Sequence, residues 1–354
     1  MAYRLLLLAG ALAAARPAHA LGGDLVFTET NDTQRNELVV LQARGGAFHP
    51  LWRVATGGRG TGAGLGSQGA VTLSDDGLWL VAVNAGSNEV SLFSVGSSGR
   101  PILLDVAPSG GTGPISAAIR EGLVYVLNAD GLAGFAIGPH GGLRPLGVTR
   151  PLSAPAAGPA QVSFAPDGDA LVVTEKATNC VDVFPVDDDG RAGPVTCHPS
   201  VGKTPFGFAF ADDILIVSEA FGGAPGASAA TSYVLEDDSL QPVTRSAPTT
   251  QTAACWIAIT PDGRFAYATN TGSGTVTGYR VGRDGELVRL DGGVTGTTGG
   301  APIDAGVSPD GDALYVLDDT RHTIVAFRVQ RDGTLARLGE SGALPSASVG
   351  LVVR

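Results

Sequence analysis

Residues 261–270, PDGRFAYATN, combine a tight-turn signal with an alternating strand that ends in a polar side chain. Asp262-Gly263 is the turn, because Asp bonds to nearby backbone and Gly accepts left-handed backbone angles. Residues 265–270 then read as a strand. The same pattern recurs six times, at residues 22–29, 76–84, 121–128, 167–175, 212–219 and 310–318. A period of mostly about 45–50 residues indicates a repeat fold.

Each repeat contains three further strand signals around this central one. Around PDGRFAYATN, an apolar run starts at Trp256, an alternating strand starts at Thr275, and another strand follows Gly285. Four-stranded units repeated radially form a β-propeller. The first unit has no inner strand of its own, whereas residues 345–353 are a spare one. We therefore predict an all-β, seven-bladed propeller of antiparallel blades, closed by the C-terminal strand joining the first blade.

The N-terminus has the pattern of a secretory signal peptide. A basic start, an apolar run of about eleven residues and an Ala-x-Ala end at Ala20 predict cleavage after residue 20, leaving one propeller domain over residues 21–354. We expect a periplasmic or secreted monomer with no membrane span, since the run is too short to cross a bilayer. Loss of Arg4 and Arg16 would take the formal charge from −11 to −13. Such an acidic surface argues against nucleic acid as a partner.

Two of the three cysteines are placed to meet. Cys180 and Cys197 flank a predicted hairpin whose turn is at residues 187–190. In an oxidising compartment the two can form a disulfide, and two reduced, buried thiols are an equal alternative. Cys255 would be left unpaired.

Polar residues end the second strand of every repeat, where they should gather at one mouth of the central channel. They are Glu29, Asn84, Asn128, Glu175, Glu219, Asn270 and Asp318. From the inner strands, Gln161, Phe206, Trp256 and Asp304 should point to the same mouth. We interpret this set as a binding site for a small molecule. The alternative for each Asn or Asp is a turn cap bonded to nearby backbone.

The repeats resemble those of the lactonase-type seven-bladed propeller family, which includes bacterial 6-phosphogluconolactonases and fungal carboxymuconate cyclases. The pattern SQGAVTLSDDG…VAVNAGSNEVSLF from Ser67 and the later Pro-Asp-Gly copies carry the resemblance, and PDGRFAYATNTGSGTV is similar to the YVTN-type repeat of surface propellers. Where the family's enzymes have Arg and His, this chain has Ala160 and Gln161. The family glutamate matches Glu175. The resemblance thus implies Glu175 as the base and Lys176 as the cation for a developing oxyanion.

Other chemistry has little support in the sequence. Neither zinc-ligand spacing nor a phosphate-binding loop before a helix occurs. Glu29, Glu175, Glu219 and Asp318 could hold a cation such as Ca²⁺ through oxygen ligands, but we expect no cofactor. The glycine-rich run at residues 56–69 reads as a flexible or ligand-covering loop.

Three functional hypotheses remain. The first is a lactone hydrolase or cyclase that uses Glu175 and Lys176. The second is a non-catalytic exported propeller that binds a small ligand or a protein partner on the same face. The third, a purely structural protein, is favoured if side chains block the channel mouth.

Overall fold

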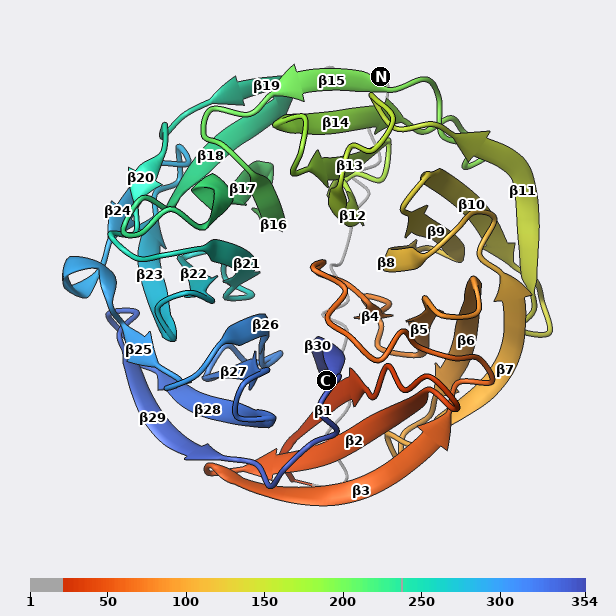
Figure 1. Cartoon of the computed structure of the whole chain (residues 1–354), viewed down its shortest axis with the longest axis horizontal. Helices are drawn as coiled ribbons and strands as arrows, with labels where there is room; N and C mark the ends of the chain where they lie inside the picture. The colour runs from red at the N-terminus through yellow and green to blue at the C-terminus, as the bar shows by residue number, and fades with distance from the viewer. Residues whose placement is uncertain (1–21, 237) are drawn as a thin grey trace, which may run out of the picture.

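The computed structural model describes residues 22–236 and 238–354, so the predicted signal peptide lies outside the described residues. These residues form seven antiparallel sheets arranged as blades around a central axis (Figure 1). Only two short 3-10 helices interrupt the strands of this part of the chain, η1 (Phe221–Gly223) and η2 (Asp291–Gly293). No helix in it is long and apolar enough to cross a membrane. The predicted all-β, seven-bladed architecture is confirmed.

Blades 1 to 4 each contain four strands, which follow one another from the axis outward. Blade 1 has β30 (Val349–Val353), β1 (Asp24–Glu29), β2 (Glu37–Arg44) and β3 (Ala47–Ala55). Blade 2 has β4 (Val71–Leu73), β5 (Trp79–Asn84), β6 (Glu89–Val95) and β7 (Pro101–Pro108). Blade 3 has β8 (Pro114–Arg120), β9 (Leu123–Asn128), β10 (Gly131–Ile137) and β11 (Leu143–Arg150). Blade 4 has β12 (Pro159–Phe164), β13 (Ala170–Glu175), β14 (Cys180–Pro185) and β15 (Thr196–Pro199).

Blades 5 and 6 each carry a fifth, two-residue strand beside their third strand. Blade 5 has β16 (Pro205–Ala211), β17 (Ile214–Glu219), β18 (Ala229–Glu236) and β19 (Ser239–Pro242), with β20 (Ala247–Pro248). Blade 6 has β21 (Ala254–Ile259), β22 (Phe265–Asn270), β23 (Thr275–Val281) and β24 (Leu287–Arg289), with β25 (Gly296–Thr297). Blade 7 has β26 (Pro302–Val307), β27 (Ala313–Asp318), β28 (Thr323–Val329) and β29 (Leu335–Glu340).

The ring closes through blade 1, as the sequence predicted. Strand β30 pairs antiparallel with β1, placing Val352 opposite Phe27. Beyond the ladder, the backbones of Arg354 and Leu25 exchange two hydrogen bonds of 2.8 Å. The innermost strand of the first blade therefore comes from the far end of the chain, which leaves no blade incomplete.

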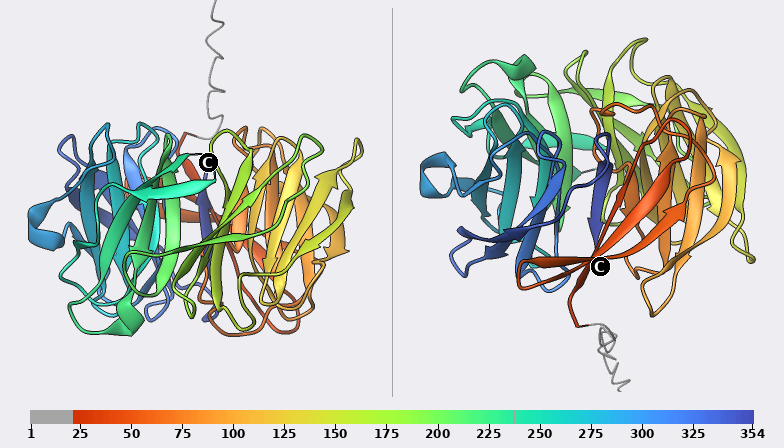
Figure 2. Two further views of the ribbon diagram at one scale, coloured as in Figure 1. Left: turned by 90° about the horizontal axis from the view of Figure 1, so that it is seen from above. Right: turned by 60° about the horizontal axis from the view of Figure 1, so that its bottom comes forward.

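The hydrophobic core is divided into layers between neighbouring blades. In one layer, Val81 and Val90 of blade 2 pack with Val124 and Phe135 of blade 3, and all four side chains are buried. Because each strand alternates its side chains between two faces, every blade contributes to the layer on either side. The sheets of neighbouring blades accordingly stand side by side around the axis (Figure 2).

A disulfide joins Cys180 of β14 to Cys197 of β15, with the two Cα atoms 5.7 Å apart and a sequence separation of 17. This is one of the two alternatives that the sequence left open. Cys255 is free and buried in the inner strand of blade 6. Burial raises the pKa of its thiol to about 11, so the thiolate form is disfavoured near neutral pH.

Candidate functional site

The seven strand-end residues are fully buried and face the junctions between blades. Five of them contact the loop that enters their own blade from the preceding one, whereas Glu29 bonds to Asn36 and Asn270 bonds to Thr275 and Thr277 within their own blades. The Glu219 carboxylate accepts hydrogen bonds from the Gly202 N–H at 2.8 Å and the Ser246 hydroxyl at 2.7 Å. The Asp318 carboxylate likewise accepts the Ala301 N–H at 3.0 Å.

The sequence predicted that these side chains gather at one mouth of the channel, whereas the structure buries all seven at the blade junctions. Buried loop backbone needs hydrogen-bond partners, and the polar strand ends supply them. Direct contact between these seven residues and a ligand stays a prediction. Their carboxylates also lie in four different blades. In the described part of the chain, the only cluster with metal-ligating geometry is Cys180, Asp182 and Cys197, whose two sulfurs form the disulfide.

Glu175 and Asp182 form a buried pair of carboxyl groups in blade 4. The Glu175 carboxylate accepts hydrogen bonds from the Ser153 backbone N–H at 2.9 Å, from the Ser153 hydroxyl, and from the Thr178 hydroxyl at 2.6 Å. Burial would raise the pKa of Glu175, but hydrogen bonds from Asp182, Ser153 and Thr178 lower it. Burial, with the neighbouring Glu175, raises the pKa of Asp182 to about 8. The pair therefore holds one proton near neutral pH.

Two glutamine side chains bind inner-strand backbone in the same two-bonded manner. Gln161 donates to the Phe208 carbonyl at 3.0 Å and accepts the Phe208 N–H at 2.7 Å. Gln68 donates to the Ile257 carbonyl at 2.7 Å and accepts the Ile257 N–H at 3.1 Å. Gln161 reaches the neighbouring blade, whereas Gln68 reaches from the loop before blade 2 to blade 6, and Gly207 of blade 5 leaves room for it. A Cβ at Gly207 would lie 2.2 Å from the Gln68 Oε1 atom.

The glycine-rich loop that carries Gln68 closes the mouth where the inner strands begin. Its segment before β4 reaches the centre of the ring (Figure 1). The Trp256 indole donates to the Ser67 carbonyl at 2.9 Å. The loop is therefore tied to blade 6 by two side chains and covers this mouth of the channel, which is the condition that keeps the third hypothesis, a purely structural protein, in play beside the two binding hypotheses. Asp304 lies buried at the same level, where burial raises its pKa well above the usual range.

Lys176 stands over this closed mouth. Its ammonium nitrogen lies 4.7 Å from the centre of the Phe206 ring and donates to the Gly66 carbonyl at 2.5 Å. Phe206 in turn packs against Trp256, with ring centres 5.0 Å apart. Burial lowers the pKa of Lys176 to about 8. No ion pair to Lys176 occurs among the residues that the structure describes.

The structure thus brings together some of the predicted site residues and separates others. Lys176, Phe206 and Trp256 form one cluster. Glu175 is next to Lys176 in sequence, yet its carboxylate turns to Ser153 inside the blade junction. Glu175 and Lys176 as a catalytic pair stay a prediction. The sequence reasoning missed Gln68, although Gly207 was a usable signal, because a glycine there leaves a gap in the inner layer.

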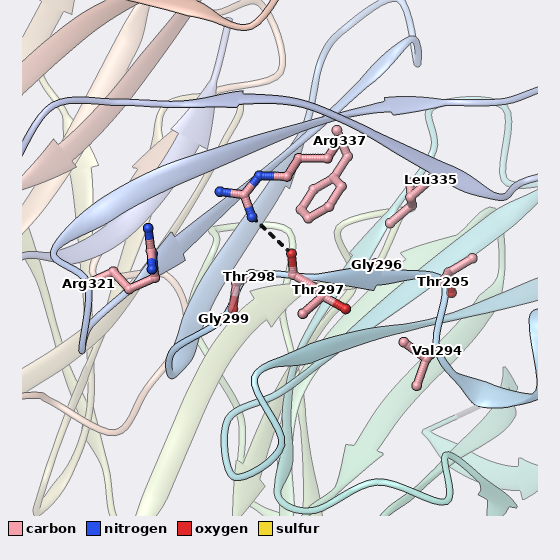
Figure 3. A pocket seen from close by; sticks show the side chains of 10 residues that line it. Val294, Thr295, Gly296, Thr297, Thr298, Gly299, Arg321, Leu335 and Arg337 are labelled. Atoms are coloured by element: carbon pink, nitrogen blue, oxygen red, sulfur yellow. Dashed lines mark hydrogen bonds between the residues drawn. The ribbon is translucent and has the colours of Figure 1, made fainter.

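A second cluster of cations lies between blades 6 and 7. Arg321 and Arg337 border a surface pocket of about 510 Å³ with Thr297 (Figure 3). Both guanidinium groups are paired with Glu340, at 3.0 Å and 2.6 Å. Glu340 offsets one of these two charges and gives each guanidinium group an ion-pair partner, whereas Lys176 has none among the described residues. Lys176 is therefore the better candidate for contact with an anionic ligand.

The fold is a seven-bladed propeller, and part of the sequence matches a family model for such propellers. The family model described as lactonase, 7-bladed beta-propeller matches residues 231–352. A putative 6-phosphogluconolactonase from Bacteroides fragilis has a similar structure, with a TM-score of 0.73, 18% identity and coverage of 95% of this chain and 99% of that one. A periplasmic gluconolactonase from Pseudomonas aeruginosa has a TM-score of 0.73, 15% identity and coverage of 93% and 98%. These matches confirm the resemblance noted in the repeats.

The likeness in fold extends to a protein with different chemistry. A hydrazine synthase chain from Kuenenia stuttgartiensis has a TM-score of 0.59, 16% identity and coverage of 85% of this chain and 94% of that one. No curated protein matches the sequence. At identities of 15–18%, these solved structures establish the fold but not the reaction, which depends on the residues of the site.

We predict that Gly207→Ala destabilises the propeller by about 1–3 kcal/mol, because its methyl group would collide with Gln68 and with the Cys255 carbonyl. Thermal unfolding followed by circular dichroism measures the effect. Gly64→Ala is the matched control, since nothing lies within 4 Å of a Cβ there. Equal melting temperatures for the two variants would contradict the proposed cross-channel contact.

We predict that Asp182→Asn flattens the pH dependence of stability. With its pKa raised to about 8, Asp182 keeps a proton in the folded state that the unfolded state releases near pH 4. Its contribution is therefore fully present below about pH 4 and is lost as the pH rises to about 8. Asparagine mimics the protonated acid, so urea unfolding at pH 5 and pH 8 should differ less in the variant. Exposed Asp188→Asn is the control. If the unfolding free energy of Asp182→Asn changed between pH 5 and pH 8 as much as that of the wild type, the shared proton would be refuted.

Proposed function

We propose that this propeller binds a small sugar acid, or the lactone of one, over Lys176 on the face where the inner strands begin. The single observation that carries the proposal is a half-buried ammonium group with no carboxylate partner in the described part of a chain whose formal charge is −11. A cation taken partly out of water gains most from an added counter-charge. An anionic ligand group would supply it.

The surroundings of Lys176 favour an organic acid over a free inorganic ion. The buried rings of Phe206 and Trp256 form an apolar floor beneath the ammonium group, and apolar surroundings are common in small-molecule sites. Both a lactone carbonyl and the carboxylate formed when the ring opens accept a hydrogen bond from an ammonium group. The likeness to proteins described as gluconolactonases supports this ligand class.

Lactone hydrolysis is the second candidate, favoured by the match of residues 231–352 to the lactonase family model. Hydrolysis needs a proton acceptor for the attacking water. The Gln161 amide both donates to and accepts from the Phe208 backbone, so it does not take a proton from water. The Glu175 oxygens are already engaged by hydrogen bonds from Ser153 and Thr178. With its pKa lowered to about 8, Lys176 in its neutral amine form is the remaining acceptor in this cluster. In this scheme turnover rises with pH through about 8.

We predict that Lys176→Met weakens gluconate binding at pH 7 by tenfold or more, because methionine keeps the chain length and removes the charge. In the wild type, affinity should also fall as the pH rises above about 8, when the ammonium loses its proton. Tryptophan fluorescence titration of the mature protein measures both effects. Lys203→Met is the matched control, since Lys203 is the other lysine of the chain. Gluconate binding that is equal in both variants would sink the proposal.

We predict that Glu175→Gln lowers stability by about 1.5–3 kcal/mol, because the amide nitrogen would face the hydrogen-bond donors that the carboxylate now satisfies. The melting temperature and proton release from a panel of gluconolactone, its 6-phosphate and aliphatic lactones are measured together. Turnover by the wild type that is lost in a variant with an unchanged melting temperature would instead make Glu175 the catalytic base. Turnover lost only in Lys176→Met supports the amine.

A further inference from the structure

The central channel stays open beyond the blocked mouth. The strand registers place one residue of each inner strand at the same level, opposite Val26, Val81, Tyr125, Val172, Ile216, Tyr267 and Tyr315 of the second strands. These seven inner-strand residues are all small: Thr72, Ala118, Ser163, Ala209, Ala258, Gly306 and Val353. Because none carries a bulky side chain, the channel is not filled at this level.

The result is a cavity of about 980 Å³ whose lining includes all seven residues. Gln68 and Gln161 line its inner end, and exposed residues of the turns after the inner strands, such as Asp75 and Asp212, line its other end. The cavity is therefore a cup that is blind on the Lys176 side and open on the opposite face. Its volume is at the upper end of the range typical of small-molecule sites.

Backbone groups provide hydrogen-bond donors and acceptors along this cup. The N–H groups of Ser74, Thr260 and Ser308 donate to the second strands of their blades, at 3.0, 2.9 and 2.8 Å. In an antiparallel ladder the backbone of alternate residues points the opposite way. The residues just before these three must therefore direct their N–H and C=O groups to the channel: Leu73, Ile259 and Val307. Closer to the Lys176 side, the Gln68 and Gln161 side chains already hydrogen-bond the channel-facing N–H and C=O groups of Ile257 and Phe208.

Acidic side chains surround the open end of the cup. Every turn of blades 2 to 7 that follows an inner strand carries at least one: Asp75, Asp76, Glu121, Asp167, Asp169, Asp212, Asp213, Asp262, Asp310 and Asp312. Arg120, the arginine that lines the cavity, lies 3.9 Å from Asp75 and 3.6 Å from Glu121. Such a rim repels anions, including sugar acids and sugar phosphates. The walls, by contrast, offer both donors and acceptors without a compensating positive charge.

We propose that this cup is a second binding site, which takes an uncharged polyhydroxylated molecule such as a mono- or disaccharide through the turn face. Hydroxyl groups donate and accept hydrogen bonds equally, as the alternating backbone groups of the wall require. The site is separate from the one over Lys176, because Gln68, Gln161 and Trp256 lie between the two. The two sites also differ in ligand charge, since the cup takes an uncharged molecule and the site over Lys176 takes an anion.

Isothermal titration of the mature protein with glucose, trehalose and myo-inositol tests the proposal, with gluconate and spermidine as charged comparators. Ser163→Phe and Ala209→Phe each place a bulky ring in the cup from a different blade. We expect binding of at least one uncharged probe to weaken tenfold or more in both variants. Ala47→Phe, on the exposed outer strand of blade 1, is the matched control and should bind as the wild type does.

The outcomes separate this site from the Lys176 site. Lys176→Met should leave binding of the uncharged probe unchanged while it weakens gluconate binding. The proposal is overturned if the wild type binds none of the three uncharged probes, or if both filled variants, shown to be folded by circular dichroism, bind as the wild type does. It is also overturned if spermidine or gluconate competes for the cup with higher affinity than the uncharged probes.

Discussion

The pairing of β30 with β1 joins the first described blade to the last segment of the chain, and the ring depends on it. Without β30, β1 would expose an unpaired edge toward the axis. Blade 7 would also lose the side chains of β30 that pack against it. Val26 and Leu351 of blade 1 share a buried cluster with Tyr315 and Leu317 of blade 7. Closure therefore fixes the positions of all seven inner strands around one axis. In that arrangement Gln68 and Gln161 lie at one end of the channel, and the acidic turns surround the other.

The polar residues that end the second strands show how a repeat can imitate a binding site in sequence. Glu219 and Asp318 occupy equivalent places in two blades, and each holds the incoming loop through backbone N–H groups. Glycines at 202 and 300 bring those loops close, since a Cβ at either would meet the carboxylate. In four of the seven blades the carboxylate or amide side chain at this place satisfies buried backbone of the incoming loop, so the recurrence reflects a structural need. Lys176, by contrast, occupies a repeat position that holds a cation only in blade 4; the equivalent residues are Thr30, Ala85, Ala129, Ala220, Thr271 and Asp319.

The sequence was sufficient for the fold because its signals are local. Asp-Gly turns, alternating strands and a constant period each concern neighbouring residues, and the spare strand at residues 345–353 indicated closure. The sequence also named Lys176, Phe206 and Trp256. It did not place Gln68, whose contact with Ile257 spans 189 positions and crosses the channel. It also placed the Glu175 carboxylate at the mouth, whereas the side chain turns into the junction toward Ser153. Side-chain direction at a strand end depends on the loop packed against it, and that loop comes from another repeat.

The disulfide between Cys180 and Cys197 bears on how the protein can be produced. Strand β15 has four residues and forms the outer edge of blade 4, paired only with β14. A crosslink between positions 17 residues apart lowers the entropy of the unfolded chain and so raises its free energy by about 3 kcal/mol in the loop-entropy account. Material made in a reducing cytoplasm would lack this restriction and would present a frayed edge strand on its outer wall. Recombinant preparations from oxidising and reducing compartments would then differ in resistance to proteases at residues 186–199, even though both form the same ring.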